Sequence, residues 1–157
     1  MNGISDVLLE VGASLGLENF RLDEQGTCQV SLDGRLAVLQ EVASVGQLLT
    51  VMRAGPLPLQ GAGVALHRLM GVSYDETERQ GVVVSLDPET HEVCLHRYDG
   101  LVGLTAEGYL TGLETLVDRF DEVRAILDGE GASPGENDGA SGRCVGDRVL
   151  SEDVLRV

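Results

Sequence analysis

Apolar positions near the N-terminus recur at the spacing of an amphipathic helix. They are Ile4, Val7, Leu8, Val11 and Leu15. Residues three and four positions apart lie on one face of a helix, so this segment predicts a helix with a single apolar stripe. Gly16 follows the last turn, where a glycine can adopt the left-handed conformation that ends a helix.

The next segment has the alternating pattern of a β-hairpin. Cys28, Val30 and Leu32 alternate with polar residues, and alternation resumes from Leu36 to Val42. The pair Asp33-Gly34 between the two runs is suited to the positive φ values of a two-residue turn. Two antiparallel strands are therefore predicted directly after the first helix.

The remaining apolar pattern predicts five further elements. A third strand is expected from Gln47 to Ala54, and a helix weakened by two glycines from Leu59 to Met70. Ser73 to Gln80 is polar and charged and is expected to be a loop. A second hairpin should join Val82–Leu86 to Val93–Tyr98. A long helix capped by Thr105 follows, with an apolar stripe formed by Leu113, Leu116, Phe120, Val123 and Leu127.

The predicted order is helix, three strands, helix, two strands, helix. This order indicates an α+β fold with helices packed against a twisted, mainly antiparallel sheet. The domain is expected to span residues 1–128, and residues 129–157 to form a flexible, acidic, Gly/Ser-rich C-terminal tail. The final stretch, CVGDRVLSEDVLRV, contains clustered valines and leucines that fit either a short helix, a docking peptide or a frayed end.

The segment LLEVGASLGLENFRLDEQGTCQVSLDGRLAVLQEV resembles the opening of the CesT-type, or Tir-chaperone-like, class I type III secretion chaperones. The resemblance covers roughly the first 128 residues, and the expected loop at Ser73–Gln80 is longer than the family's connection. It implies a cytoplasmic homodimer without ATPase activity that keeps the extended N-terminal region of one or more effectors competent for secretion. It also makes the secretion ATPase, or another part of the export apparatus, a candidate partner.

Net charge narrows the choice of partners. The chain has 157 residues with 26 acidic and 11 basic side chains, all of the latter arginine. Such a surface repels nucleic-acid phosphates and anionic membranes, so no nucleic acid is expected to bind. No apolar run approaches the roughly 20 residues that cross a bilayer, so no membrane insertion is expected. The three cysteines lie far apart without a CxxC spacing, which favours a reducing compartment.

No catalytic or metal-binding motif emerges from the spacing of reactive residues. His91, Cys94 and His96 lie close together, but His91 belongs to a turn and no second cluster completes a tetrahedral set, so no metal is expected. Cys28 and Cys94 fit alternating strand positions without a nucleophile motif around them. The chain is therefore not expected to be an enzyme or to need a cofactor, and a small hydrolase using Cys94 or His96 is a remote alternative.

Two sets of apolar residues are candidate contacts. Effector contacts are expected at apolar strand positions that alternation leaves on the solvent side, flanked by residues of the first helix. An extended peptide can pair with a strand edge and place side chains in adjacent pockets. The candidate effector contacts are Val7, Leu8, Leu39, Leu49 and Val51. The resemblance places the dimer contact on the central helix and the strand after it, at Leu66, Leu69, Met70 and Val83. The alternatives are that the first set fills the core or the dimer seam, and that the domain is a regulatory module for a folded partner unrelated to secretion.

Overall fold

The computed structural model describes residues 3–79 and 81–129, except for the side chains of residues 75–79. It contains three helices and five strands in the order expected from the sequence. The elements are α1 (Ile4–Leu15), β1 (Thr27–Leu32), β2 (Arg35–Val42), β3 (Gln47–Pro56), α2 (Ala62–Arg79), β4 (Val82–Leu86), β5 (Glu92–Gly100) and α3 (Ala106–Leu127). The predicted α+β fold is thereby confirmed, whereas the predicted tail lies outside the described residues apart from Gly129.

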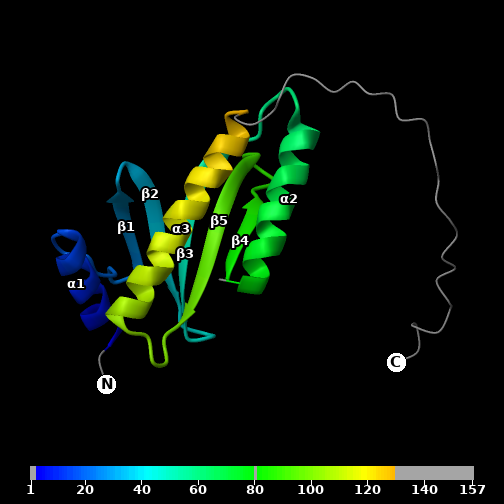
Figure 1. Cartoon of the computed structure of the whole chain (residues 1–157). Coiled ribbons are helices and arrows are strands. Elements are labelled where there is room, and N and C mark those ends of the chain that lie inside the picture. The colour runs from blue at the N-terminus through cyan, green and yellow to red at the C-terminus, as the bar shows by residue number, and fades with distance from the viewer. Residues whose placement is uncertain (1–2, 80, 130–157) are drawn as a thin grey trace, which may run out of the picture.

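The strands form one antiparallel sheet in the order β1-β2-β3-β5-β4. In Figure 1, α3 crosses the sheet diagonally, with α1 beside β1 and α2 beside β4. β1 and β4 are therefore the two edge strands.

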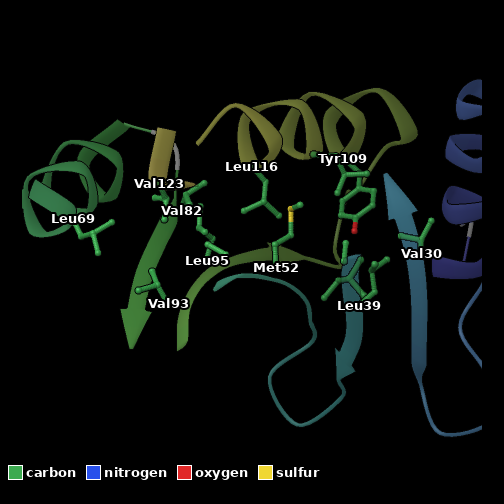
Figure 2. Packing of buried hydrophobic residues seen from close by; sticks show 14 of the residues in the cluster. Val30, Leu39, Met52, Leu69, Val82, Val93, Leu95, Tyr109, Leu116 and Val123 are labelled. Carbon is green, nitrogen blue, oxygen red and sulfur yellow. The ribbon is translucent and has the colours of Figure 1, made fainter. Parts of the chain in front are cut away.

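The core fills the layer between α3 and the sheet. Figure 2 shows Tyr109 and Leu116 of α3 pointing toward Met52, Leu39 and Leu95 of the central strands. These five side chains are fully buried. Alternate residues of each strand contribute to this layer, which leaves the intervening residues on the opposite, outer face of the sheet.

Local signals position the ends of the elements as the sequence predicts. Gly16 has a φ of 69°, and the N–H of Leu17 donates to the carbonyl of Gly12, which closes α1. The β1–β2 turn has positive φ values at Asp33 (50°) and Gly34 (80°). The hydroxyl of Thr105 accepts a hydrogen bond from the N–H of Gly108 at 3.1 Å and so caps α3.

The prediction of a loop from Ser73 to Gln80 is wrong up to Arg79, because α2 continues through it. The expectation rested on the loss of apolar periodicity after Met70. Glutamate and arginine are good helix formers, however, and Tyr74 continues the four-residue spacing of Leu66 and Met70.

Candidate functional site

A groove opens where the end of α1, the end of β1 and the first half of α3 meet. It has a volume of about 320 Å³ and is mostly aliphatic. We call it the α1–α3 groove; it is lined by Leu15, Leu17, Ser31, Leu32, Asp33, Leu110, Leu113, Glu114, Val117 and Asp118. Leu113 is buried at 3% exposure, whereas Leu15 is 40% exposed, so the groove has a buried floor and an accessible apolar wall.

The sequence creates this groove through two local features. Leu110, Leu113 and Val117 lie three and four residues apart, so α3 presents them on one face. The turn at Gly16 brings Leu17 back beside Leu15 at the end of α1. The groove escaped prediction because its residues come from three separate elements, and the periodicity of α3 indicated only a core stripe.

The charged residues that line the groove are all acidic. They are Asp33, Glu114 and Asp118. None of the ion pairs between described residues involves these three carboxylates. Nearby, Arg35 after the hairpin turn donates to both carboxylate oxygens of Asp121 at 2.8 Å and ties the hairpin to α3. An apolar segment that carries basic residues would therefore match the groove in both shape and charge.

The edge of β1 has unpaired backbone groups next to the groove. Asp23 bonds to both the N–H and the C=O of Thr27, so these groups point away from β2. Backbone direction alternates along an antiparallel strand, so the N–H and C=O of Gln29 and Ser31 point to the same outer edge. Within residues 3–79 and 81–129 no backbone hydrogen bond occupies them there, although the thiol of Cys28 donates to the carbonyl of Gln29 at 3.8 Å. An added strand could pair with this edge.

The opposite edge of the sheet is less accessible. The N–H of Val84 on β4 donates to the hydroxyl of Ser73 on α2 at 3.4 Å. α2 thus covers part of this edge, and the β1 edge is the better site for an added strand.

Leu49 and Val51 lie on the outer face of the sheet and are half-buried, as alternation predicts. In the sheet register Leu49 is opposite Tyr98, and Val51 is opposite His96. Their role as effector contacts stays a prediction.

The other three predicted effector contacts belong to the core. Val7 is 4% exposed, and Leu8 and Leu39 are completely buried. Leu8 and Leu39 are part of the main apolar cluster under the helices. The expectation that Leu39 faces solvent is wrong, because β2 turns Leu39 toward the helices and leaves Leu36 exposed on the other face. Val7 and Leu8 were expected to flank the effector site, but their side chains are buried on the inner face of α1.

α2 presents an exposed apolar stripe formed by Leu66, Met70 and Tyr74. Met70 is 71% exposed and Tyr74 68% exposed, and the three residues are spaced by four along the helix. Val83 on β4 is also exposed, so three of the four predicted dimer contacts are accessible.

Leu69 does not fit the predicted dimer contact. Its side chain is 4% exposed and packs in the core of its own chain. Tyr74 lies in the segment predicted to be a loop and is therefore absent from the predicted dimer contacts. The i, i+4 spacing from Met70 was the signal that could have identified it.

The reactive side chains do not form a catalytic arrangement. Burial raises the pKa of the thiols of Cys28 and Cys94, which disfavours the nucleophilic thiolate. Ser85 Oγ lies 2.6 Å from Nε2 of His96, a pair that the sequence did not indicate. Within the described residues no hydrogen bond holds the other ring nitrogen of His96, so no third group orients the ring as in a catalytic triad.

Two further features of the described residues bear on possible function. They contain no cluster of three His, Cys, Asp or Glu side chains suited to a metal ion. In the same part of the chain, no helix has both the length and the apolar composition to cross a membrane.

Comparison with solved structures gives the same fold. The ExsC–ExsE complex matches with a TM-score of 0.67 at 21% identity, covering 80% of this chain and 97% of that one. The Yersinia pestis type III secretion chaperone SycH, solved with a fragment of YscM2, matches with a TM-score of 0.62 at 22% identity, covering 76% and 98%. YbjN from E. coli, described as a putative transcription regulator, matches with a TM-score of 0.54 at 17% identity, covering 79% and 89%. At these identities the likeness establishes the fold alone.

The sequence itself decides the family. No curated protein matches the chain significantly. The model of the Tir chaperone protein (CesT) family, however, matches residues 6–124, which is well over half of the 157 residues. The resemblance seen in the helix and hairpin at the N-terminus is thereby confirmed, and the chain belongs to the Tir chaperone protein (CesT) family.

Proposed function

We propose that this protein is a cytoplasmic type III secretion chaperone that binds an extended N-terminal segment of an effector at the β1 edge and the α1–α3 groove. The observation that carries this proposal is the position of the groove beside Ser31, whose backbone N–H and C=O face the open edge of β1. A strand added to β1 would place alternate side chains on the helix side of the sheet, where the groove can accept them.

The same site supports binding rather than catalysis. Its walls are aliphatic and its charged residues are carboxylates without a metal cluster among the described residues. Two structural neighbours also point to protein partners: one is a chaperone solved with a fragment of another protein, and the other is a two-protein complex. We therefore assign this chain no enzymatic activity and no cofactor.

The proposed chaperone acts as a homodimer. Leu66, Met70 and Tyr74 form an exposed apolar stripe on α2 that a second copy could bury by an isologous contact. In Figure 1 α2, which carries this stripe, lies beside β4, whereas α1 lies beside β1. The residues that line the α1–α3 groove come from α1, α3 and the β1 side of the sheet. Dimer formation would thus leave the groove of each protomer accessible.

A regulatory protein-interaction domain is the second candidate function. It is favoured by one observation, the similarity of the fold to YbjN. A regulator would recognise a folded partner, whereas the groove and the strand edge fit an extended chain.

The deciding experiment measures binding of N-terminal segments from effector candidates encoded near the gene for this protein. Leu15→Asp should abolish or strongly weaken binding because it places a charge on the apolar wall of the groove. Leu9→Asp is the matched control, since Leu9 lies on the same helix with similar exposure (48% against 40% for Leu15) but outside the groove. Equal loss in both variants, or binding only to folded partners, would contradict the proposal.

A further inference from the structure

The C-terminal residues beyond the described part of the chain have a composition unlike the segment that precedes them. Residues 130–142 contain two alanines and no larger aliphatic residue. Residues 143–157, which we call the C-terminal segment, read RCVGDRVLSEDVLRV. Their valines and leucines are Val145, Val149, Leu150, Val154, Leu155 and Val157. An apolar peptide of this kind gains free energy by binding an apolar surface.

The geometry brings the C-terminal segment within reach of the α1–α3 groove. The groove lies along the first half of α3, and the described chain ends at Gly129, just past the end of the same helix. From Val117 to Gly129 the distance along the helix axis is about 18 Å at a rise of about 1.5 Å per residue. Residues 130–142 link Gly129 to the C-terminal segment and are rich in glycine and serine. A flexible chain of this length and composition has a mean end-to-end distance of about 20 Å. The linker therefore has the length needed to return the C-terminal segment to the groove.

The charges of the domain and of the C-terminal segment also favour binding of this segment in the α1–α3 groove. Up to Asp128 the chain contains 8 basic and 20 acidic residues. The C-terminal segment contains three arginines (Arg143, Arg148 and Arg156) and three acidic residues, so it is neutral. Two of these arginines directly flank pairs of aliphatic residues, Arg148 before Val149-Leu150 and Arg156 after Val154-Leu155. Apolar side chains next to guanidinium groups match an aliphatic groove with carboxylates at Asp33, Glu114 and Asp118.

We propose that the C-terminal segment binds in the α1–α3 groove of its own chain and competes there with the effector. The competitive part of this inference rests on the proposed function, whereas binding of the segment in the groove does not. A short flexible linker gives an attached peptide an effective concentration of the order of 1 mM. Even a weak contact is then substantially populated, and an effector must displace it, which lowers the apparent affinity for effectors. The segment would protect the apolar groove until an effector arrives.

Binding of the segment can be detected in the full-length protein. In a Cys28→Ala/Cys94→Ala background the remaining Cys144 takes a nitroxide spin label at the start of the C-terminal segment. Paramagnetic broadening is expected for NMR signals of Leu15, Leu110 and Val117 in the groove. Met70, exposed on α2, should be unaffected. Leu150→Asp/Val154→Asp should remove the broadening while the protein stays folded.

Competition for the groove is measured with the unlabelled full-length parent and its Leu150→Asp/Val154→Asp variant. The probe is an effector N-terminal segment that co-purifies with the parent protein. It should bind the Leu150→Asp/Val154→Asp variant several-fold more tightly than the parent. Ser141→Asp in the linker adds charge without removing an apolar side chain and is expected to leave the affinity at the parent value.

The outcomes separate this inference from the proposed function. Absence of broadening in the groove overturns the inference, whatever effectors do. Broadening in the groove, together with equal effector affinity of the parent and the Leu150→Asp/Val154→Asp variant, overturns the proposed competition. Broadening together with failure of every effector segment to bind either protein supports the intramolecular contact and contradicts the proposed function.

Discussion

The hydroxyl groups of Thr50 on β3 and Tyr109 on α3 form a buried hydrogen bond of 2.8 Å at the centre of the core. Both residues are completely buried. Burial raises the pKa of Tyr109, so its hydroxyl stays protonated and available for this bond. The contact fixes the position of the first turns of α3 over the sheet, from which the same helix presents Leu110 to the α1–α3 groove.

We expect Tyr109→Phe and Thr50→Val each to lower the free energy of unfolding by about 1–3 kcal/mol, because each leaves one buried hydroxyl without its partner. The double variant should lose less than the sum, since it removes both hydroxyls. Urea unfolding of the four proteins measures this cycle. Strictly additive losses would show that the hydrogen bond contributes nothing to stability.

The exposed apolar stripe on α2 can be tested as the dimer interface. Met70→Asp/Tyr74→Asp should convert a dimer into a folded monomer, because each charge would be buried without a partner at the proposed interface. Light scattering after size exclusion gives the mass, and circular dichroism shows whether the fold persists. Val102→Asp, at a 95% exposed loop position, should remain dimeric. A parent protein that is monomeric at micromolar concentration would contradict the proposed dimer.

Leu69→Asp distinguishes the core from the interface. Leu69 is 4% exposed, so a carboxylate there should destabilise the protomer itself by several kcal/mol rather than only dissociate the dimer. If the Leu69→Asp protein is instead a folded monomer with the same melting temperature as Met70→Asp/Tyr74→Asp, Leu69 acts at the dimer interface and not in the core.

Much of the fold could be predicted because local signals agree with it. Gly16 ends α1, Asp33-Gly34 forms the hairpin turn, and Thr105 caps α3, each at the position expected from sequence. The error at Ser73–Gln80 arose because the apolar periodicity weakens after Met70, whereas the helix propensity of glutamate and arginine favours continuation of α2 to Arg79.

The site was harder to predict than the fold. Alternation correctly assigns Leu49 and Val51 to the outer face but gives the wrong phase for β2, where Leu39 is completely buried on the helix side and Leu36 is 55% exposed. The α1–α3 groove joins residues nearly a hundred positions apart, such as Leu15 and Leu110, and sequence periodicity does not report such contacts.

Acid should destabilise this protein partly through His96. Burial lowers the pKa of His96, so the folded state binds a proton less readily than the unfolded state, whose histidine titrates near 6.5. The contribution of His96 is fully present above that value and is lost as the pH falls below it. Urea midpoints at pH 7.5 and 5.5 should therefore differ more for the parent than for His96→Gln. His67→Gln, at an exposed position on α2, is the control and should retain the difference seen in the parent.

The outer face provides a separate test of the original effector contacts. Leu49→Asp/Val51→Asp should weaken effector binding and leave the dimer assembled if the bound segment continues from the β1 edge across this face. Calorimetric titration with an effector segment measures the affinity. Unchanged affinity in this double variant, beside loss in Leu15→Asp, would restrict binding to the α1–α3 groove and the β1 edge.

Strand addition at β1 can be tested through the backbone N–H of Ser31. The N–H of Ser31 points away from β2, so Ser31→Pro removes a donor from the open edge without removing a hydrogen bond from the β1–β2 ladder. We expect this variant to keep most of its stability and to bind effector segments at least about tenfold more weakly, through loss of an edge hydrogen bond and the steric block by the proline ring. Ser31→Ala, which keeps the N–H, is the matched control and should bind like the parent. Equal binding by Ser31→Pro and Ser31→Ala would exclude pairing at this position and leave the groove to act through side chains alone.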